Sequence, residues 1–185
     1  MTSTELALSA QRDITLDILN VASQGGNIMH ASRMFNTANP EQAAAIMLKG
    51  YELGLPMTAA FDFIHNIQGK LSLSPAGALA LIHASGQLKS LTFDEQPDSC
   101  TVTMTRSNGL TYTSKFTMAM AATAGLTKQG GNWDKYPANM LRWRAIGYCA
   151  DILFGDILAG MKTADQFGAN INEAGEVIEG EVVNE

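Results

Sequence analysis

The sequence predicts an α+β fold, in which a small antiparallel β-sheet with hairpins packs against a long C-terminal helix and N-terminal helices. Apolar residues near the N-terminus recur at helical spacing, and a long amphipathic pattern follows Pro137. Two segments of alternating polarity flank Ser107-Asn108-Gly109, which is typical of a β-hairpin. The chain has 185 residues, of which 46% are apolar, so it can bury a core without disulfides. We expect one core domain over residues 1–168 and, because few apolar residues follow, a disordered acidic tail over 169–185.

The first part of the chain is expected to be helical. Five apolar residues share one helical face: Leu6, Ala10, Ile14, Ile18 and Val21. Gly25-Gly26 are expected to end this helix, and a second helical stretch follows them. Residues 41–53 predict a mostly buried helix, with Pro40 suited to its first turn and Gly54-Leu55-Pro56 as its stop.

Short strands and a helix are expected next. Residues 63–68 and 70–73 predict two strands around Gly69. Ser74-Pro75 predict the cap and first turn of a helix that runs to Ser85, and a further strand is expected over residues 88–95.

The second half of the chain contains two expected helices. A short apolar helix is expected over residues 118–124, followed by a mobile loop that contains Gly125 and Gly130-Gly131. Pro137 then opens a long helix that extends to about Met161.

The pairing of the hairpin strands depends on the length of the loop between them. A two-residue Asn108-Gly109 turn would place Met104 opposite Thr113. A three-residue loop, with Gly109 in the left-handed conformation, places Met104 opposite Tyr112. We favour the three-residue loop because it gives one apolar face and one polar face rich in threonine.

Charge is distributed unevenly along the chain. The net charge is −6, but six of the 18 acidic residues lie after Lys162, where there is no Lys or Arg. Between Arg106 and Arg144, six basic residues stand against the single acid Asp134. A basic middle segment and an acidic C-terminal end therefore permit a nucleic-acid partner, against which the net charge alone would argue.

Basic and aromatic side chains alternate in the middle segment, as they do in single-strand binders, where cations neutralise phosphates and aromatic faces stack on bases. The candidate DNA-binding residues are Lys70, Arg106, Lys115, Lys128, Trp133, Lys135, Arg142 and Arg144. Trp133 lies beside glycines in the expected loop, whereas Trp143 falls on the core stripe of the long helix. Arg142 and Arg144 are two positions apart, so at most one of them faces a given groove directly. The lysines also suit a plain solubilising role, and Lys70 suits a hairpin tip.

Sequence patterns of common catalytic sites are absent. The chain has no Gly-x-Ser-x-Gly elbow, no Gly-x-x-x-x-Gly-Lys loop and no His-Glu-x-x-His, so we expect a non-enzymatic protein without a cofactor. Cys100 and Cys149 have no Cys/His cluster near them, which argues against zinc and for small buried side chains. No membrane span and no secretory signal are visible, so we expect a cytoplasmic protein.

Two segments resemble the signatures of RecT-type phage single-strand DNA annealing proteins, the RecT/Redβ superfamily. The first segment runs from Ala45 to Met57 (AIMLKGYELGLPM) and is followed by Gly69-Lys70 and Leu73-Ser74. The second comprises Trp133, Tyr136-Pro137, Met140 to Ala145 (MLRWRA) and Phe154-Gly155. Spacing and order both match, and the resemblance covers residues 10–168.

The resemblance implies an ATP-independent protein that coats single-stranded DNA, pairs it with a complementary strand and holds the annealed duplex in a homo-oligomeric ring or helical filament. It implies a RecT/Redβ-like annealing fold with DNA in a basic groove between sheet and helices. Arg144 and Arg142 match basic positions of that groove, and Lys70 matches the hairpin lysine. A phage or prophage origin, a bacterial cytoplasm, and a phage exonuclease or host single-strand binding protein as further partners are implied in the same way.

Two features depart from this pattern, and two other functions stay open. Asp151 stands where relatives commonly carry arginine, so one phosphate contact is lost or moved, and the C-terminal module of longer relatives is missing. A protein–protein interaction module that acts through the acidic tail would have no DNA affinity. A metal-dependent nuclease that uses Asp94, Asp98 and Asp151 would cleave DNA in the presence of Mg²⁺.

Overall fold

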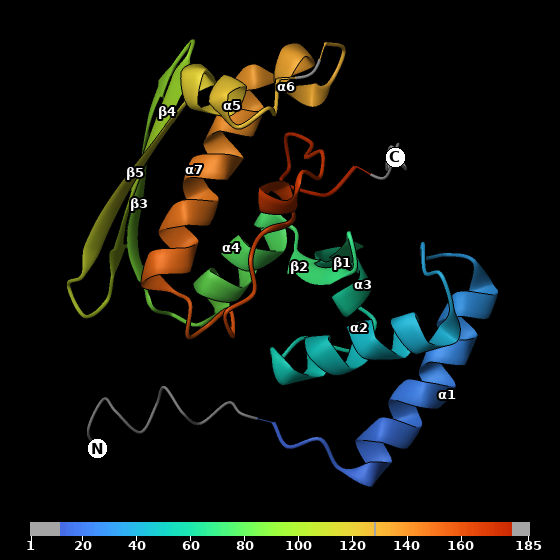
Figure 1. Cartoon of the computed structure of the whole chain (residues 1–185). Coiled ribbons are helices and arrows are strands. Elements are labelled where there is room, and N and C mark those ends of the chain that lie inside the picture. The colour runs from blue at the N-terminus through green and yellow to red at the C-terminus, as the bar shows by residue number, and fades with distance from the viewer. Residues whose placement is uncertain (1–11, 128, 179–185) are drawn as a thin grey trace. The chain divides into compact units, whose positions relative to one another are not determined.

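The computed structural model describes residues 12–127 and 129–178 and has a mixed α+β architecture (Figure 1). The chain divides into two compact units, residues 1–64 and 65–185. The region that the sequence predicts to be one core domain, residues 1–168, therefore contains the boundary between them.

Helices make up the first unit: α1 (Leu16–Ser32), α2 (Pro40–Glu52) and α3 (Ala60–Phe63). The side chain of Thr15 caps α1, because its Oγ1 accepts a hydrogen bond from the backbone N of Ile18 at 3.3 Å. α1 continues through Gly25-Gly26, so the helix end predicted there is wrong and the two expected helical stretches form one helix.

The reason for the glycine at position 26 is the close approach of α2. A Cβ on Gly26 would lie 2.7 Å from the backbone O of Pro40 and 2.9 Å from the backbone N of Ala44. These distances are too short for a real side chain, so the helix crossing requires glycine. Helix-end rules cannot distinguish this use of glycine from a stop signal.

α2 has the boundaries that the sequence predicts to within one residue. Pro40 is its first residue, and the Oδ1 of Asn39 caps it by accepting a hydrogen bond from the backbone N of Gln42 at 2.7 Å. The side chains of Ile46 and Met47 are buried. The helix ends at Glu52, two residues before Gly54, as expected.

The second unit contains two antiparallel sheets. The strands β1 (Ile64–Ile67), which begins at the last residue of the first unit, and β2 (Lys70–Leu73) form a hairpin. The other sheet has the order β3-β4-β5 and consists of β3 (Leu88–Gln96), β4 (Ser99–Arg106) and β5 (Thr111–Thr117). The helices of this unit are α4 (Pro75–Ala84), α5 (Met118–Thr123), α6 (Asn132–Lys135), α7 (Pro137–Leu153) and the 3₁₀ helix η1 (Ala164–Phe167).

The register of the β4–β5 hairpin confirms the three-residue loop. Met104 lies opposite Tyr112, and Gly109 has a φ of 91°. The backbone N of Arg106 donates to the O of Leu110 at 2.7 Å and so closes the loop. The sheet therefore has the predicted apolar and threonine-rich faces.

α7 covers the apolar face of the three-stranded sheet (Figure 1). Met140, Trp143 and Ile146 are buried, as the predicted core stripe requires. α7 ends at Leu153 rather than near Met161, since the chain turns there and then passes through Ala159 and Gly160 at positive φ.

A segment after α7, which we name the C-terminal strap (residues 162–178), is packed against the rest of the second unit. The backbone N of Ala76 donates to the O of Gly175 at 2.9 Å, and the Nδ2 of Asn139 donates to the O of Ile171 at 2.8 Å. Ile171 is fully buried and pairs with Val177 in an isolated β-bridge. The prediction of disorder is therefore wrong for residues 169–178, because one isoleucine and a few backbone bonds hold a segment of low apolar content; residues 179–185 lie outside the described residues.

Candidate nucleic-acid interface

Arg106, the last residue of β4, is held by a carboxylate. Its Nη1 and Nη2 donate to the two carboxylate oxygens of Asp156 at 2.8 and 2.6 Å, and Nη1 also donates to the O of Leu153 at 2.8 Å. The hydrogen bond from Arg106 lowers the pKa of Asp156 from its ordinary value. The two parallel bonds are the geometry that arginine offers to a phosphate, and here a side chain of the protein occupies it.

Arg142 extends from α7 to the sheet and is paired as well. Its Nε donates to Oε1 of Glu95 on β3, and its Nη2 donates to Oε2 at 3.1 Å. This hydrogen bond is the main cause of a lowered pKa at Glu95 and a raised pKa at Arg142. The side chains are 37% and 42% exposed, so water screens the pair and a phosphate can compete for Arg142.

Arg144 is buried, in contrast to the groove position that the resemblance implies. Its Nη1 donates to the backbone O of Asp165 at 2.5 Å and to the carboxylate Oδ2 at 3.2 Å. The guanidinium carbon lies 5.7 Å from the ring centroid of Phe116 and 5.9 Å from that of Tyr148. Burial raises the pKa of Asp165, an effect that the Arg144 charge opposes.

Trp133 belongs to the core and not to a mobile loop. It is 6% exposed and lies on α6, with its ring centroid 5.8 Å from that of Phe116. In this structure its ring is not available to stack on a base, which corrects the expectation for this residue. The preceding glycines suggested a loop, whereas the contact with Phe116, which decides the burial, is not visible in the local sequence.

Three of the predicted lysines are exposed. Lys115 lies on the threonine-rich face of β5, Lys135 ends α6, and Lys70 begins β2. Among the residues that the structure describes, none of the three has a carboxylate oxygen within 4.0 Å. Lys128 lies outside the described residues.

The helix η1 brings together residues from the two sequence signatures. The Nζ of Lys70 lies 5.0 Å from the ring centroid of Phe167, and the O of Phe167 accepts a hydrogen bond from the Nε2 of Gln68 at 3.4 Å. Asp165, in the same helix, binds Arg144. Lys70 and Arg144, which are far apart in the sequence, therefore both contact one short helix.

Asp151, on α7, binds two residues of the C-terminal strap. Its Oδ2 lies 2.9 Å from the Nζ of Lys162 and accepts a hydrogen bond from the Nε2 of Gln166 at 3.0 Å. Gly147, one turn earlier on α7, leaves room for Thr163, since a Cβ there would lie 2.7 Å from its Oγ1. An acid at position 151 thus holds the strap on α7. The sequence does not reveal these partners, because the expected continuation of the helix to about Met161 hides the turn that brings Lys162 and Gln166 back to Asp151.

The outer face of the three-stranded sheet carries hydroxyl groups. The Oγ1 atoms of Thr103 and Thr113 are 2.8 Å apart, and those of Thr105 and Thr111 are 3.0 Å apart. These bonds cross from β4 to β5 and satisfy the threonines among themselves. Lys115 is therefore a cation at the edge of a polar surface that also carries Asp94, since both residues lie opposite Thr101.

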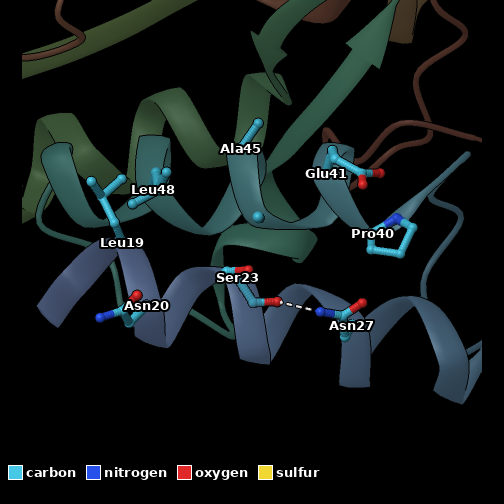
Figure 2. Close-up of a pocket in the computed structure, with 9 residues that line it drawn as sticks. Leu19, Asn20, Ser23, Asn27, Pro40, Glu41, Ala45 and Leu48 are labelled. Carbon is cyan, nitrogen blue, oxygen red and sulfur yellow. Dashed lines mark hydrogen bonds between the residues drawn. The ribbon is translucent and has the colours of Figure 1, made fainter. Parts of the chain in front are cut away.

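The groove between α1 and α2 in the first unit does not suit a polyanion. Figure 2 shows Leu19, Ser23 and Asn27 on the α1 side and Leu48 on the α2 side, with the hydrogen bond from Asn27 Nδ2 to Ser23 O at 2.9 Å within α1. Glu41 is the single charged residue among those that line it. A phosphate backbone would meet a negative charge there and no positive one.

The alternative chemistries find little support among the described residues. No group of three or more His, Cys, Asp or Glu side chains is placed to hold a metal ion, so Asp94, Asp98 and Asp151 do not form such a group. Cys100 and Cys149 are buried, and desolvation raises the pKa of each thiol to about 11. Over the same part of the chain, no helix has both the length and the apolar character to cross a membrane.

In comparisons with known proteins, no family model matches this chain and no curated protein matches it. The residues and their arrangement in space therefore carry the functional argument.

Proposed function

We propose that the protein binds single-stranded DNA and anneals complementary strands without ATP, as a homo-oligomeric ring or filament of the RecT/Redβ type. The observation that carries this proposal is the meeting at η1 of Lys70 and Arg144, one from each of the two signatures. The α+β architecture, with an antiparallel sheet backed by α7, agrees with what the resemblance implies for the fold.

Electrostatics give this proposal a definite form. Lys70, Lys115 and Lys135 are exposed, whereas the guanidinium groups of Arg106, Arg142 and Arg144 are held by carboxylates. DNA binding then begins at the lysines and gains Arg142 by exchange of its Glu95 partner for a phosphate. Phosphate contacts release counterions, so affinity falls steeply with salt and does not depend on base sequence.

Annealing requires no hydrolysis in this mechanism. A row of subunits holds one strand extended and offsets the phosphate repulsion of the second strand, and base pairing supplies the free energy. A phage or prophage origin, a bacterial cytoplasm, and an exonuclease or single-strand binding protein as partner belong to the same proposal.

The test combines binding with strand pairing. Fluorescence anisotropy of a labelled oligonucleotide is measured at several NaCl concentrations, and annealing of a complementary strand is followed by fluorescence quenching without ATP. We expect tight binding at low salt, a steep loss of affinity as salt rises, and faster pairing than in protein-free controls. Absence of binding at low salt would leave the interaction module as the better explanation, and cleavage of the DNA on addition of Mg²⁺ would indicate the nuclease.

A further inference from the structure

Arg144 is enclosed by the protein. Its side chain is 8% exposed and that of Asp165 is 1% exposed. The Nη1 of Arg144 makes the two hydrogen bonds that join it to Asp165, and the Nε of Arg144 has no hydrogen-bond partner among the described residues. A phosphate has no access to this guanidinium while η1 is in place.

The other end of η1 supports the tip of the β1–β2 hairpin. Phe167, the last residue of η1, contacts Lys70 through its ring and Gln68 through its backbone O. Just before η1, the O of Lys162 accepts a hydrogen bond from the backbone N of Leu73 at 3.0 Å. Residues 162–167 thus contact α7 through Arg144, the hairpin turn through Gln68, and the two ends of β2 through Lys70 and Leu73. Lys70 itself remains exposed.

We propose that Arg144 is a positioning residue for DNA binding and not a phosphate contact: it anchors η1 through Asp165, and η1 holds the hairpin tip where Lys70 meets the DNA backbone. This inference rests on the proposed function and assigns a different role to a residue of the same site. A lysine side chain has a long flexible stem, and the contact with the ring of Phe167 restricts where its charge lies.

The ion pair suits this role because of what happens when one partner is lost. A buried carboxylate without its arginine is an uncompensated charge, which destabilises the packing of the segment that carries it. An apolar pair of similar volume avoids this penalty, since such pairs can replace a buried ion pair without loss of stability. A positioning role and a contact role therefore predict different results for a variant in which apolar residues replace both Arg144 and Asp165.

The main experiment measures oligo(dT) binding to the full chain over a range of NaCl concentrations, with melting temperatures alongside. We expect Arg144→Met to weaken binding by roughly tenfold, and Arg144→Met/Asp165→Leu to restore both the affinity and the wild-type dependence on salt. Lys70→Gln is expected to make the fall of log K with log salt shallower, with the magnitude of the slope reduced by about one. A double variant that melts like the wild type, yet binds as weakly as Arg144→Met with a slope lower by about one, would overturn the inference.

A second variant keeps every cation in place. Asp165→Asn releases Arg144 from its charged partner, so a contact role predicts tighter binding, whereas a positioning role predicts weaker binding by roughly threefold with the salt slope unchanged. Unchanged or tighter binding by Asp165→Asn contradicts the inference, even if the double variant does not fold. Failure of the wild-type protein to bind oligo(dT) would instead contradict the proposed function itself.

Discussion

Arg142 and Glu95 illustrate how a single ion pair decides whether a basic residue is available to a polyanion. The pair is partly exposed, so little free energy is needed to open it. Glu95→Gln removes the charge that competes with phosphate for Arg142. We expect oligonucleotide binding to tighten and the slope of log K against log salt to steepen by about one, as measured by anisotropy titrations.

A matched control separates this effect from a general change of charge. Asp94 is the neighbouring acid on β3, and it bonds Gln96 and no basic residue among those described. Asp94→Asn changes the net charge by the same amount and leaves Arg142 paired. If Asp94→Asn steepens the slope as much as Glu95→Gln does, the pair with Arg142 is not the cause.

Among the elements, α1 and α2 offer a test of close helix packing. Gly26→Ala would bring a Cβ within 2.7 Å of the backbone O of Pro40, and backbone cannot yield as a side chain can. We expect the free energy of unfolding to fall by about 1–3 kcal/mol, measured by urea or thermal unfolding.

Gly25 provides the control for that substitution. Its added Cβ would meet the Cε of Met47 at 2.5 Å, which is the end of a flexible side chain. Alanine is also the better helix former by about 1 kcal/mol, so Gly25→Ala should be close to neutral. Equal destabilisation by both variants would show that the close approach of α2 is not the reason why position 26 requires glycine.

The C-terminal strap offers a second test at this scale. Ile171 is fully buried and Ile178 is 40% exposed, although both lie in the strap. Ile171→Ala should cost about 2–5 kcal/mol of stability, and Ile178→Ala should stay within about 0.5 kcal/mol of the wild type. Thermal unfolding that is the same for both variants would mean that the strap is not packed in solution.

The elements that the sequence predicts well are those whose causes are local. Ser74 caps α4 by accepting a hydrogen bond from the N of Gly77 at 3.0 Å, and Gly109 closes the β4–β5 loop, both as expected from residues a few positions away. The helix through Gly26 and the burial of Trp133 depend on partners that only the folded chain brings close. Local sequence patterns therefore predict neither the continuous helix nor the buried tryptophan.

The candidate site is less predictable at the level of the whole molecule, because the sequence shows the order of charges along the chain and not which charges the fold brings together. Arg106 and Arg142 bind acids 50 and 47 positions away, and Arg144 binds one 21 positions away. All three acids lie outside the basic segment. Residue type predicted where the cations stand in the sequence, but the fold decides which of them are neutralised.

The exposed lysines of the second unit allow a test on this larger scale. Lys115 and Lys135 are the basic residues of the middle segment that the structure describes as exposed. Lys115→Gln/Lys135→Gln should reduce the magnitude of the slope of log K against log salt by about two, as measured by anisotropy titrations. The control is Lys49→Gln in the first unit, whose lysine already binds Glu52 at 3.0 Å; an equal effect of this variant would show that the lysines act through net charge alone.

The three-residue loop that ends in Gly109 determines the sidedness of the entire sheet. Side chains alternate along a strand, so a shift of β5 by one position would exchange its two surfaces. Phe116 would then point to solvent, and Lys115 would be driven beneath α7, where no acid awaits it among the described residues of β4. Deletion of a single residue from this loop would thus exchange the buried and the exposed surface of β5.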